Sequence, residues 1–453
     1  MGPLVEMASK YGPVSSTFSR GRTLVVLASH RPARHVLVSN QDNYVKGIEY
    51  ELLRIVLGNG LLTAEGEDWR RQRRLVQPLF AKRHITEFVG FMTDATRDSL
   101  EQGPLAGLGE GDRVDMNRAM IELTLDVVGR ALFGADLTGE TARRVGPAMN
   151  DVLTLGSRMV RRLPTFLLAS LPGFDLSRAI SLNPESVRFQ AAVADLRQVI
   201  DQLLIEREAG GDPGDDLFGL MLSTTDPETG QAMDRDLIAD ELMTFMLAGH
   251  ETTSNGLSWT FRWLSLNPEA RERLVAEVDE VLGGRTPGFE DADRLPWTRA
   301  VIEESMRLTP PVWMVGRKAL EDDEFEGHRI PAGAGAMILI RMIHRDPEVW
   351  DNPEGFDPRR FLPENRDELP RSAYMPFGAG RRICVGSTFA LVEATLLLAM
   401  ITQRYEFDLP VWAQVQEEAA ITLRPKGGLE MIARPRSGVE PATGRPSTAA
   451  SRA

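Results

Sequence analysis

The spacing of apolar residues predicts a mainly helical protein. Apolar residues recur every three or four positions from residue 69 to about residue 136. This is the period of amphipathic helices. Helical character continues to about residue 207, with breaks at 103–111 and 163–172, and returns from residue 234 to about residue 308. Pro310 and Pro311 end the second helical region, because proline lacks a backbone N–H and disfavours helical geometry in the residue before it.

Shorter runs predict strands toward both ends of the chain. Residues 32–38 predict a first helix, whereas residues 40–66 lack a clean period and predict a partly helical loop over a cavity. The runs that predict strands are 14–27, with a turn at Gly21, then 312–320, 324–330, 336–340, 405–409 and 420–423.

The last residues have the composition of a disordered tail. From about residue 437 the chain is rich in Pro, Gly, Ser, Thr and Ala, which cannot bury enough apolar surface to fold. We therefore expect one domain over residues 1–436 and a disordered tail over 437–453. The apolar break at 164–174 is consistent either with an access route to an apolar site or with buried helix ends.

Composition narrows the classes of protein. Of the residues, 42% are hydrophobic and 26% charged, as in an ordinary globular protein, and the net charge of −13 argues against nucleic acid as a partner. Residues 1–13 form a short amphipathic segment rather than a signal peptide or membrane anchor. The apolar run 389–401 is too short to span a bilayer and contains Glu393. We expect a cytoplasmic protein.

The only cysteine among 453 residues, Cys384, lies in the segment Phe377-Gly-Ala-Gly-Arg-Arg-Ile-Cys-Val-Gly386. A lone cysteine cannot form an intramolecular disulfide or a multi-thiolate zinc site. It remains a small buried residue, a nucleophile or a single-sulfur metal ligand. Arg381, Arg382 and the N-terminus of a following helix are expected to favour the thiolate by lowering the thiol pKa.

The pattern Phe-x-x-Gly-x-Arg-x-Cys-x-Gly is met by Phe377, Gly380, Arg382, Cys384 and Gly386. It resembles the cysteine loop of the cytochrome P450 family, the haem-thiolate monooxygenases. The resemblance extends over residues 12–435. It implies a single triangular domain that is mainly α with a small β-rich lobe, and haem b bound through the Cys384 thiolate. The other four residues of the pattern are then cofactor-binding.

A second motif lies in the middle of a long predicted helix, as Ala248-Gly-His-Glu-Thr-Thr253. Glycine followed by an acid and two β-branched hydroxyl residues is unfavourable inside a helix, and such a departure from local preference indicates function. The stretch resembles the family's oxygen-activation motif. The resemblance implies catalytic roles for Glu251, which passes protons inward, and Thr252, which hydrogen-bonds dioxygen. Gly249 would leave room for a small ligand, and His250 is expected to be structural.

Two further sets of residues follow from the resemblance. Glu304 and Arg307 share one helix face, and with Arg360 they match the family's buried structural triad, which locks the cysteine loop. Trp69, Arg73, Arg317 and Arg382 match residues that bind the haem propionates. Arginine suits this role because its planar fork pairs with carboxylates.

An apolar substrate is expected from the residues that would line the cavity, although plain core packing fits the same residues. These pocket candidates are Phe245, Ala248, Val312, Trp313 and Met314.

The resemblance implies a monooxygenase that inserts one oxygen atom of O2 into a terpenoid-, steroid- or fatty-acid-like substrate. One cysteine cannot hold an iron–sulfur cluster, so electrons are expected from an external ferredoxin and ferredoxin reductase or a similar donor. A basic patch of Arg70, Arg71, Arg74 and Arg381 is expected to dock an acidic ferredoxin. The alternatives are a peroxide-driven peroxygenase, a haem-thiolate isomerase and a non-catalytic haem-binding protein.

Overall fold

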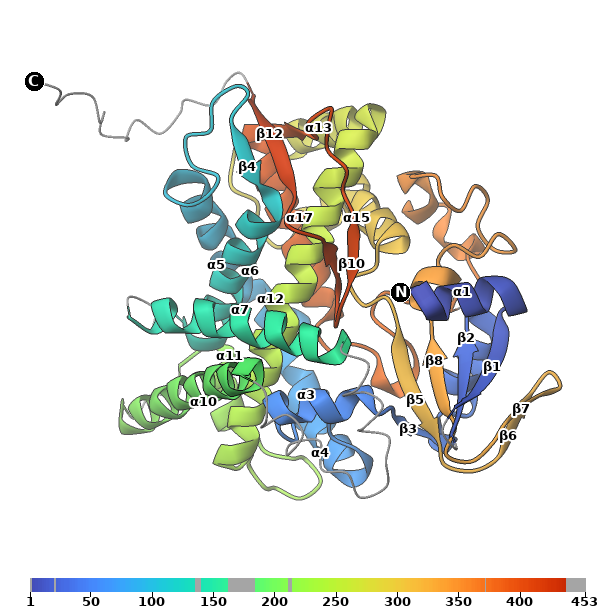
Figure 1. Ribbon diagram of the computed structural model, residues 1–453. Helices are drawn as coiled ribbons and strands as arrows, with labels where there is room; N and C mark the ends of the chain where they lie inside the picture. The colour runs from blue at the N-terminus through green and yellow to red at the C-terminus, as the bar shows by residue number, and fades with distance from the viewer. Residues whose placement is uncertain are drawn as a thin grey trace, which may run out of the picture.

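The computed structural model describes residues 2–19, 22–134, 140–161, 184–210, 214–370 and 372–436 (Figure 1). The expected tail at 437–453 and the apolar break at 164–174 lie outside the described residues. The described chain is mostly helical, with a smaller β-rich part on the right of Figure 1. The predicted mainly α fold with a small β lobe is therefore confirmed.

Helices form most of the left and centre of Figure 1. The α-helices are α1 (Gly2–Tyr11), α2 (His30–Arg34), α3 (Glu49–Leu57), α4 (Gly66–Val76), α5 (Lys82–Glu101), α6 (Met116–Phe133), α7 (Glu140–Arg161), α10 (Pro184–Gly210), α11 (Leu217–Ser223), α12 (Arg235–Leu266), α13 (Pro268–Leu282), α14 (Asp291–Arg294), α15 (Pro296–Leu308), α16 (Ile340–Ile343) and α17 (Ser387–Arg404). Short π or 3-10 turns are η1 (His35–Ser39), η2 (Gln41–Asn43), η3 (Gln77–Phe80), η5 (Pro358–Phe361), η6 (Arg366–Glu368) and η7 (Gly380–Arg382).

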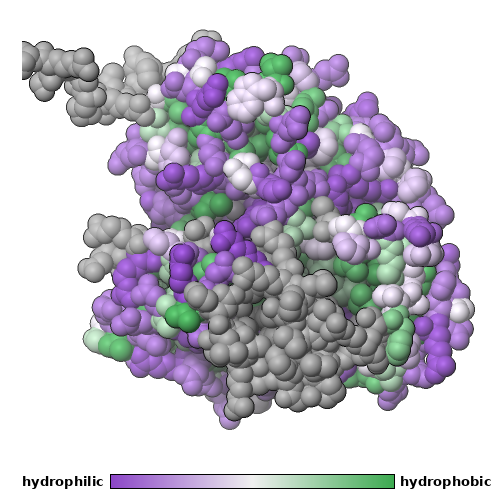
Figure 2. All heavy atoms as spheres, in the orientation of Figure 1, coloured by the Kyte–Doolittle hydropathy of each residue, from purple (hydrophilic) through white to green (hydrophobic). Residues whose placement is uncertain are grey.

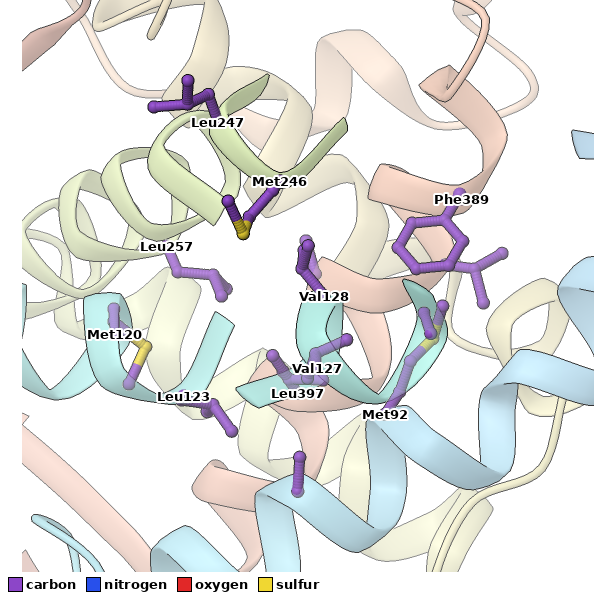
Figure 3. Close-up of a cluster of buried hydrophobic side chains, with 14 of the residues drawn as sticks. Met92, Met120, Leu123, Val127, Val128, Met246, Leu247, Leu257, Phe389 and Leu397 are labelled. Atoms are coloured by element: carbon purple, nitrogen blue, oxygen red, sulfur yellow. The ribbon is translucent and has the colours of Figure 1, made fainter. Parts of the chain in front are cut away.

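The central element is α12, which packs against α6, α10, α15 and α17. Its first turn is capped by Asp234, whose carboxylate accepts the N–H of Leu237 at 2.8 Å. Figure 3 shows Met246 directed toward the α6 side chains, whereas Leu247 points away from them. Neighbours on several sides make α12 a buried helix, so a polar residue on it requires a partner.

The β lobe contains a five-stranded sheet in the order β1-β2-β8-β5-β3. The predicted hairpin at 14–27 is confirmed as β1 (Val14–Ser19) and β2 (Arg22–Leu27). The predicted loop at 40–66 contains a short strand, β3 (Tyr44–Lys46), which pairs with β5 (Val315–Ala319). This register places Lys46 opposite Arg317. The remaining strands of the lobe are β6 (Asp323–Phe325), β7 (His328–Ile330) and β8 (Gly335–Ile338).

The prediction of a strand at 420–423 is wrong, because most of that segment is the tip of a hairpin. The hairpin joins β10 (Glu417–Ala419) to β11 (Leu423–Pro425). Ala420 and Thr422 at the tip are buried, and a buried turn has the apolar character of a strand. The other strands near this end are β4 (Arg113–Asp115), β9 (Tyr405–Asp408) and β12 (Glu430–Pro435), which form one sheet in the order β4-β12-β9.

The described surface shown in Figure 2 is mostly hydrophilic, with hydrophobic residues among the polar ones. No helix within the described ranges combines the length and the apolar character needed to cross a bilayer.

Candidate functional site

The loop before α17 holds Cys384 in a fixed backbone position. The Cys384 N–H donates to the Phe377 carbonyl at 2.9 Å, which closes the loop. Gly380 has a φ of +70°, and a Cβ there would collide with the Leu37 carbonyl oxygen. Only glycine satisfies both conditions without strain. Gly386, just before the first residue of α17, lies against the ring of Phe80.

The Cys384 side chain is accessible, although many protein atoms lie around its thiol. The side chain is exposed, yet burial is the main cause that raises the pKa of the Cys384 thiol. The Gly386 N–H and the charge of Arg73 act in the opposite direction but do not outweigh burial. The expected net lowering of this pKa by the helix N-terminus, Arg381 and Arg382 is therefore wrong for the protein without a bound cation. A metal cation at the sulfur would supply the missing stabilisation of the thiolate.

Two residues of the α12 motif are accessible although the helix is otherwise mostly buried. Ala248 is exposed and Thr252 partly exposed, although most residues around them on α12 are buried. The Thr252 hydroxyl donates to the Ala248 carbonyl at 2.7 Å. Gly249 serves packing rather than ligand access, since a Cβ there would lie 2.9 Å from Val128 of α6. That close approach corrects the expected role of Gly249.

Glu251 points to a different neighbour from Thr252. Its Oε1 accepts the Thr422 hydroxyl at 2.8 Å, and the carboxyl is buried. Burial raises the pKa of Glu251, while the Thr422 hydrogen bond and the Arg424 charge lower it. His250 behaves as a structural residue: it contacts the Met246 carbonyl at 3.1 Å, and burial lowers its pKa to about 4.

Three basic side chains lie close together where β3 pairs with β5. Lys46 lies opposite Arg317, and repulsion from Arg317 and Arg382 adds to burial in lowering the pKa of Lys46 well below its usual range. Arg382 pairs with Glu65 and lies over the Trp69 ring at 4.0 Å from its centroid. The structure thus brings together three predicted propionate residues, Trp69, Arg317 and Arg382. It adds Lys46, which sequence reasoning missed.

Arg73, the fourth predicted propionate residue, lies beside the cysteine instead. Its Nη1 donates to the Ile383 carbonyl at 2.8 Å, and its Nε donates to Gln77 at 3.1 Å. In this arrangement Arg73 acts on Cys384 by its charge and joins α4 to the cysteine loop.

The three predicted triad residues lie together, but Arg307 contacts Glu304 more closely than Arg360 does. Arg307 donates from Nε and Nη2 to the two carboxylate oxygens of Glu304, at 2.7 and 2.9 Å, with both side chains fully buried. Arg360 is looser, with its Nε 3.6 Å from Glu304 and a partly exposed side chain. Arg307 also holds the carbonyls of His344, Pro353 and Gly355, so it fastens the chain that precedes the cysteine loop.

Most of the pocket candidates are engaged in packing. Phe245 stacks edge-on against Phe80 at 5.4 Å. Trp313 is buried and donates its indole N–H to the Ala420 carbonyl at 3.1 Å. Val312 and Met314 are partly buried against apolar clusters of the β lobe. Of the five candidates, Ala248 has the exposed side chain.

Sequence reasoning also missed Glu393 of α17 as a polar site. This carboxyl is buried, its Oε2 accepts the Thr253 hydroxyl at 3.3 Å, and its Oε1 has no partner. Burial raises the pKa of Glu393 to about 8. A buried acid of this kind favours the protonated form.

We expect Glu393→Gln to remove part of the pH dependence of stability. Between the ordinary pKa of 4.5 and about 8, the folded protein binds the Glu393 proton and the unfolded chain releases it. The free energy of unfolding of the wild type therefore falls as pH rises, by up to about 1.4 kcal/mol per pH unit, whereas glutamine carries no such proton. Melting temperatures at about pH 5.5 and about pH 8.5 measure this. Equal pH dependence of stability in the wild type and Glu393→Gln would contradict this prediction. Glu110→Gln is the control, because Glu110 is exposed, and it should keep the wild-type pH dependence.

The residues present fit a haem group. One accessible thiol lies in a loop with close backbone contacts, and a cation beside it would oppose the rise of its pKa that burial causes. A separate cluster of basic side chains, Lys46, Arg317 and Arg382, has Glu49 and Glu65 beside it, which offset part of its mutual repulsion. The planar guanidinium forks of Arg317 and Arg382 are suited to pair with further carboxylates. Iron at the thiol and propionates at the cations match this chemistry.

Comparisons with known proteins agree with this geometry. The family model described as Cytochrome P450 matches residues 3–429. A Mycobacterium tuberculosis protein named as a cytochrome P450, number 132, is 38% identical over 92% of this chain and 89% of its own length. Cyclooctat-9-en-7-ol 5-monooxygenase of Streptomyces melanosporofaciens is 34% identical over 92% and 87%. Pentalenene oxygenase of Streptomyces avermitilis is 31% identical over 86% and 83%.

Proposed function

Because this chain belongs to the cytochrome P450 family of haem-iron monooxygenases, we propose that it oxygenates an apolar, terpenoid-like compound. One oxygen atom of O2 enters a C–H or C=C bond, haem b is the cofactor, and an external ferredoxin supplies electrons. The observation that carries the proposal is the accessible Cys384 thiol in a packed loop, together with the accessible Ala248 and Thr252 on a buried helix.

In this proposal different residues of the chain bind the haem, hold its propionates and supply protons. Bound haem supplies dioxygen binding, electron acceptance and cleavage of the O–O bond. Cys384 ligates the iron, and Lys46, Arg317 and Arg382 hold the propionates. Thr252 has its hydroxyl at the accessible face of α12. Glu251 supplies the protons that oxygen activation at this face consumes.

The substrate class rests on the names of two relatives. Cyclooctat-9-en-7-ol is by name an alkenol, and pentalenene is by name an alkene. Both names describe largely hydrocarbon compounds. We therefore favour a cyclic terpenoid-like compound over a linear fatty acid for this chain.

The predicted basic patch carries less free charge than its sequence indicates. All four of its arginines, Arg70, Arg71, Arg74 and Arg381, have a carboxylate within 4.0 Å, from Glu67, Asp226, Glu228 or Asp42. Such pairs reduce the positive field that would steer an acidic partner. Docking of a ferredoxin is therefore expected to depend weakly on ionic strength.

An optical titration of the ferric protein tests the proposed substrate. Cyclic terpenes, terpene alcohols, sterols and linear fatty acids are added in turn, and the Soret band is followed for a low-spin to high-spin shift. Compounds that shift it are then incubated with NADPH, ferredoxin and ferredoxin reductase. We expect oxygenated product from the cyclic terpenoids. Product only with hydrogen peroxide would favour a peroxygenase, and a shift without any product would favour a non-catalytic haem protein.

We expect Thr252→Ala to divert oxygen into hydrogen peroxide. The variant loses the one hydroxyl at the accessible face of the motif, so protons and dioxygen are no longer brought together there. The share of consumed oxygen released as peroxide should rise several-fold at unchanged haem content. Thr252→Ser keeps the hydroxyl and should behave like the wild type. An unchanged peroxide share in Thr252→Ala would remove Thr252 from the proposal.

A further inference from the structure

The tip of the β10–β11 hairpin is fixed against α12 by its backbone. The Trp313 indole donates to the Ala420 carbonyl at 3.1 Å, and the Trp259 indole donates to the Leu423 carbonyl at 2.9 Å. The Leu423 N–H donates to the Pro311 carbonyl at 2.8 Å. These three bonds hold the tip whether or not Thr422 makes a contact of its own.

Thr422 lies in a directed series of hydrogen bonds that ends at Glu251. Asn117 Nδ2 donates to Asn255 Oδ1 at 3.2 Å, and Asn255 Nδ2 donates to Thr422 Oγ1 at 3.1 Å. Because Thr422 Oγ1 accepts from this amide, its single proton is free for Glu251 Oε1 at 2.8 Å. All four side chains are buried.

The same hairpin also supplies charge to the acid. Arg424, two residues after Thr422, attracts the Glu251 carboxylate. The Arg424 Nε donates to Glu418 at 2.9 Å, and both of these side chains are partly exposed. The hairpin therefore offsets the burial of Glu251 with a neutral donor and a more distant cation.

We propose that Thr422 is a positioning residue for oxygenation: its hydroxyl holds the Glu251 carboxyl and keeps it able to ionise inside α12. This inference rests on the proposed proton-supplying role of Glu251. Loss of the hydroxyl leaves both Glu251 Oε1 and the Asn255 amide without their partner. A hydrogen bond to a charged group is strong enough that we expect the ionisation constant of Glu251 to fall about tenfold or more.

Infrared spectroscopy of the ferric enzyme without added ligand tests the contact directly. The C=O stretch of protonated Glu251 is assigned by its absence in Glu251→Gln. In Thr422→Val we expect this band to move to higher wavenumber and to titrate at higher pH. Thr422→Ser should restore both properties. Thr260→Val is the matched control, because Thr260 is a buried threonine of α12 whose hydroxyl donates to the Gly256 carbonyl within the same helix. An unmoved band in Thr422→Val would overturn the inference.

Turnover with NADPH, ferredoxin and ferredoxin reductase tests the consequence. The share of consumed oxygen released as peroxide should rise several-fold in Thr422→Val and Glu251→Gln, but not in Thr422→Ser or Thr260→Val. If the peroxide share rises in Glu251→Gln but not in Thr422→Val, the inference about Thr422 is overturned and the proposed function stays intact. No change in Glu251→Gln overturns the proposed role of the acid, and this inference with it. If Thr422→Val folds poorly, Thr422→Cys should show the same changes at smaller size, and a wild-type result would overturn the inference.

Discussion

Replacing Cys384 with serine is expected to abolish the thiolate signature of the bound haem. The loop holds residue 384 by its backbone, through the bond from its N–H to the Phe377 carbonyl, so serine occupies the same place. A serine hydroxyl does not ionise near neutral pH, and the electron donation that promotes O–O cleavage is lost. We expect oxygenation to fall by about 10³-fold or more, equivalent to about 4 kcal/mol of activation free energy.

The absorption spectrum of the reduced carbonyl complex measures this loss, together with product formation at equal haem content. Ile383→Val is the matched control, because the exposed Ile383 side chain lies next to Cys384 in the same loop. Because Cys384 is the only cysteine, a wild-type protein whose reduced carbonyl complex lacks the thiolate signature, or a Cys384→Ser variant that oxygenates at the wild-type rate, would contradict the assignment of Cys384 as the iron ligand.

Replacing Arg307 with alanine is expected to destabilise the whole protein. The Arg307 side chain is fully buried and holds the Glu304 carboxylate and three backbone carbonyls. Its removal leaves a buried carboxylate with the Asp357 N–H at 2.7 Å and the looser Arg360 as partners. Breaking a buried ion pair costs about 3–5 kcal/mol, a large part of the roughly 5–15 kcal/mol that stabilises a typical domain.

Melting temperature, soluble yield and bound haem measure this destabilisation. Arg360→Ala is the matched control. Its guanidinium is 3.6 Å from Glu304 and its side chain is 15% exposed, so the loss should be less than half as large. Arg307→Lys keeps the charge but not the planar fork and should be intermediate. Equal losses in Arg307→Ala and Arg360→Ala would contradict this ranking.

The sequence predicted those parts of the site whose contacts follow from the spacing of residues close together in the chain. Glu304 and Arg307 lie three residues apart on one helix face, so their contact follows from helical geometry. Gly380 precedes Cys384 in a short loop whose backbone requires glycine at that position. The helical regions were predictable for the same reason, since the period of α12 is visible in its own residues.

The parts that were missed depend on contacts between distant segments. Lys46 joins the cationic cluster because β3 pairs with β5, which lies more than 260 residues later. Thr422 reaches Glu251 because a buried hairpin tip is inserted against α12. In the sequence, Glu393 indicates only that residues 389–401 do not span a membrane. Its buried state depends on how α17 packs against α12, which no local pattern contains.

The pairing of β2 with β8 has a consequence for how the chain is made. Leu24 pairs with Gly335 and Leu27 with Ile338 in a parallel ladder, so the ribosome adds about 300 residues after β2 before its partner exists. At about 5–20 residues per second, the early hairpin waits roughly 15–60 s with an open strand edge. Open edges invite pairing with other chains. A chaperone that shields nascent strands should therefore raise the soluble yield, and slowing translation without one should lower it.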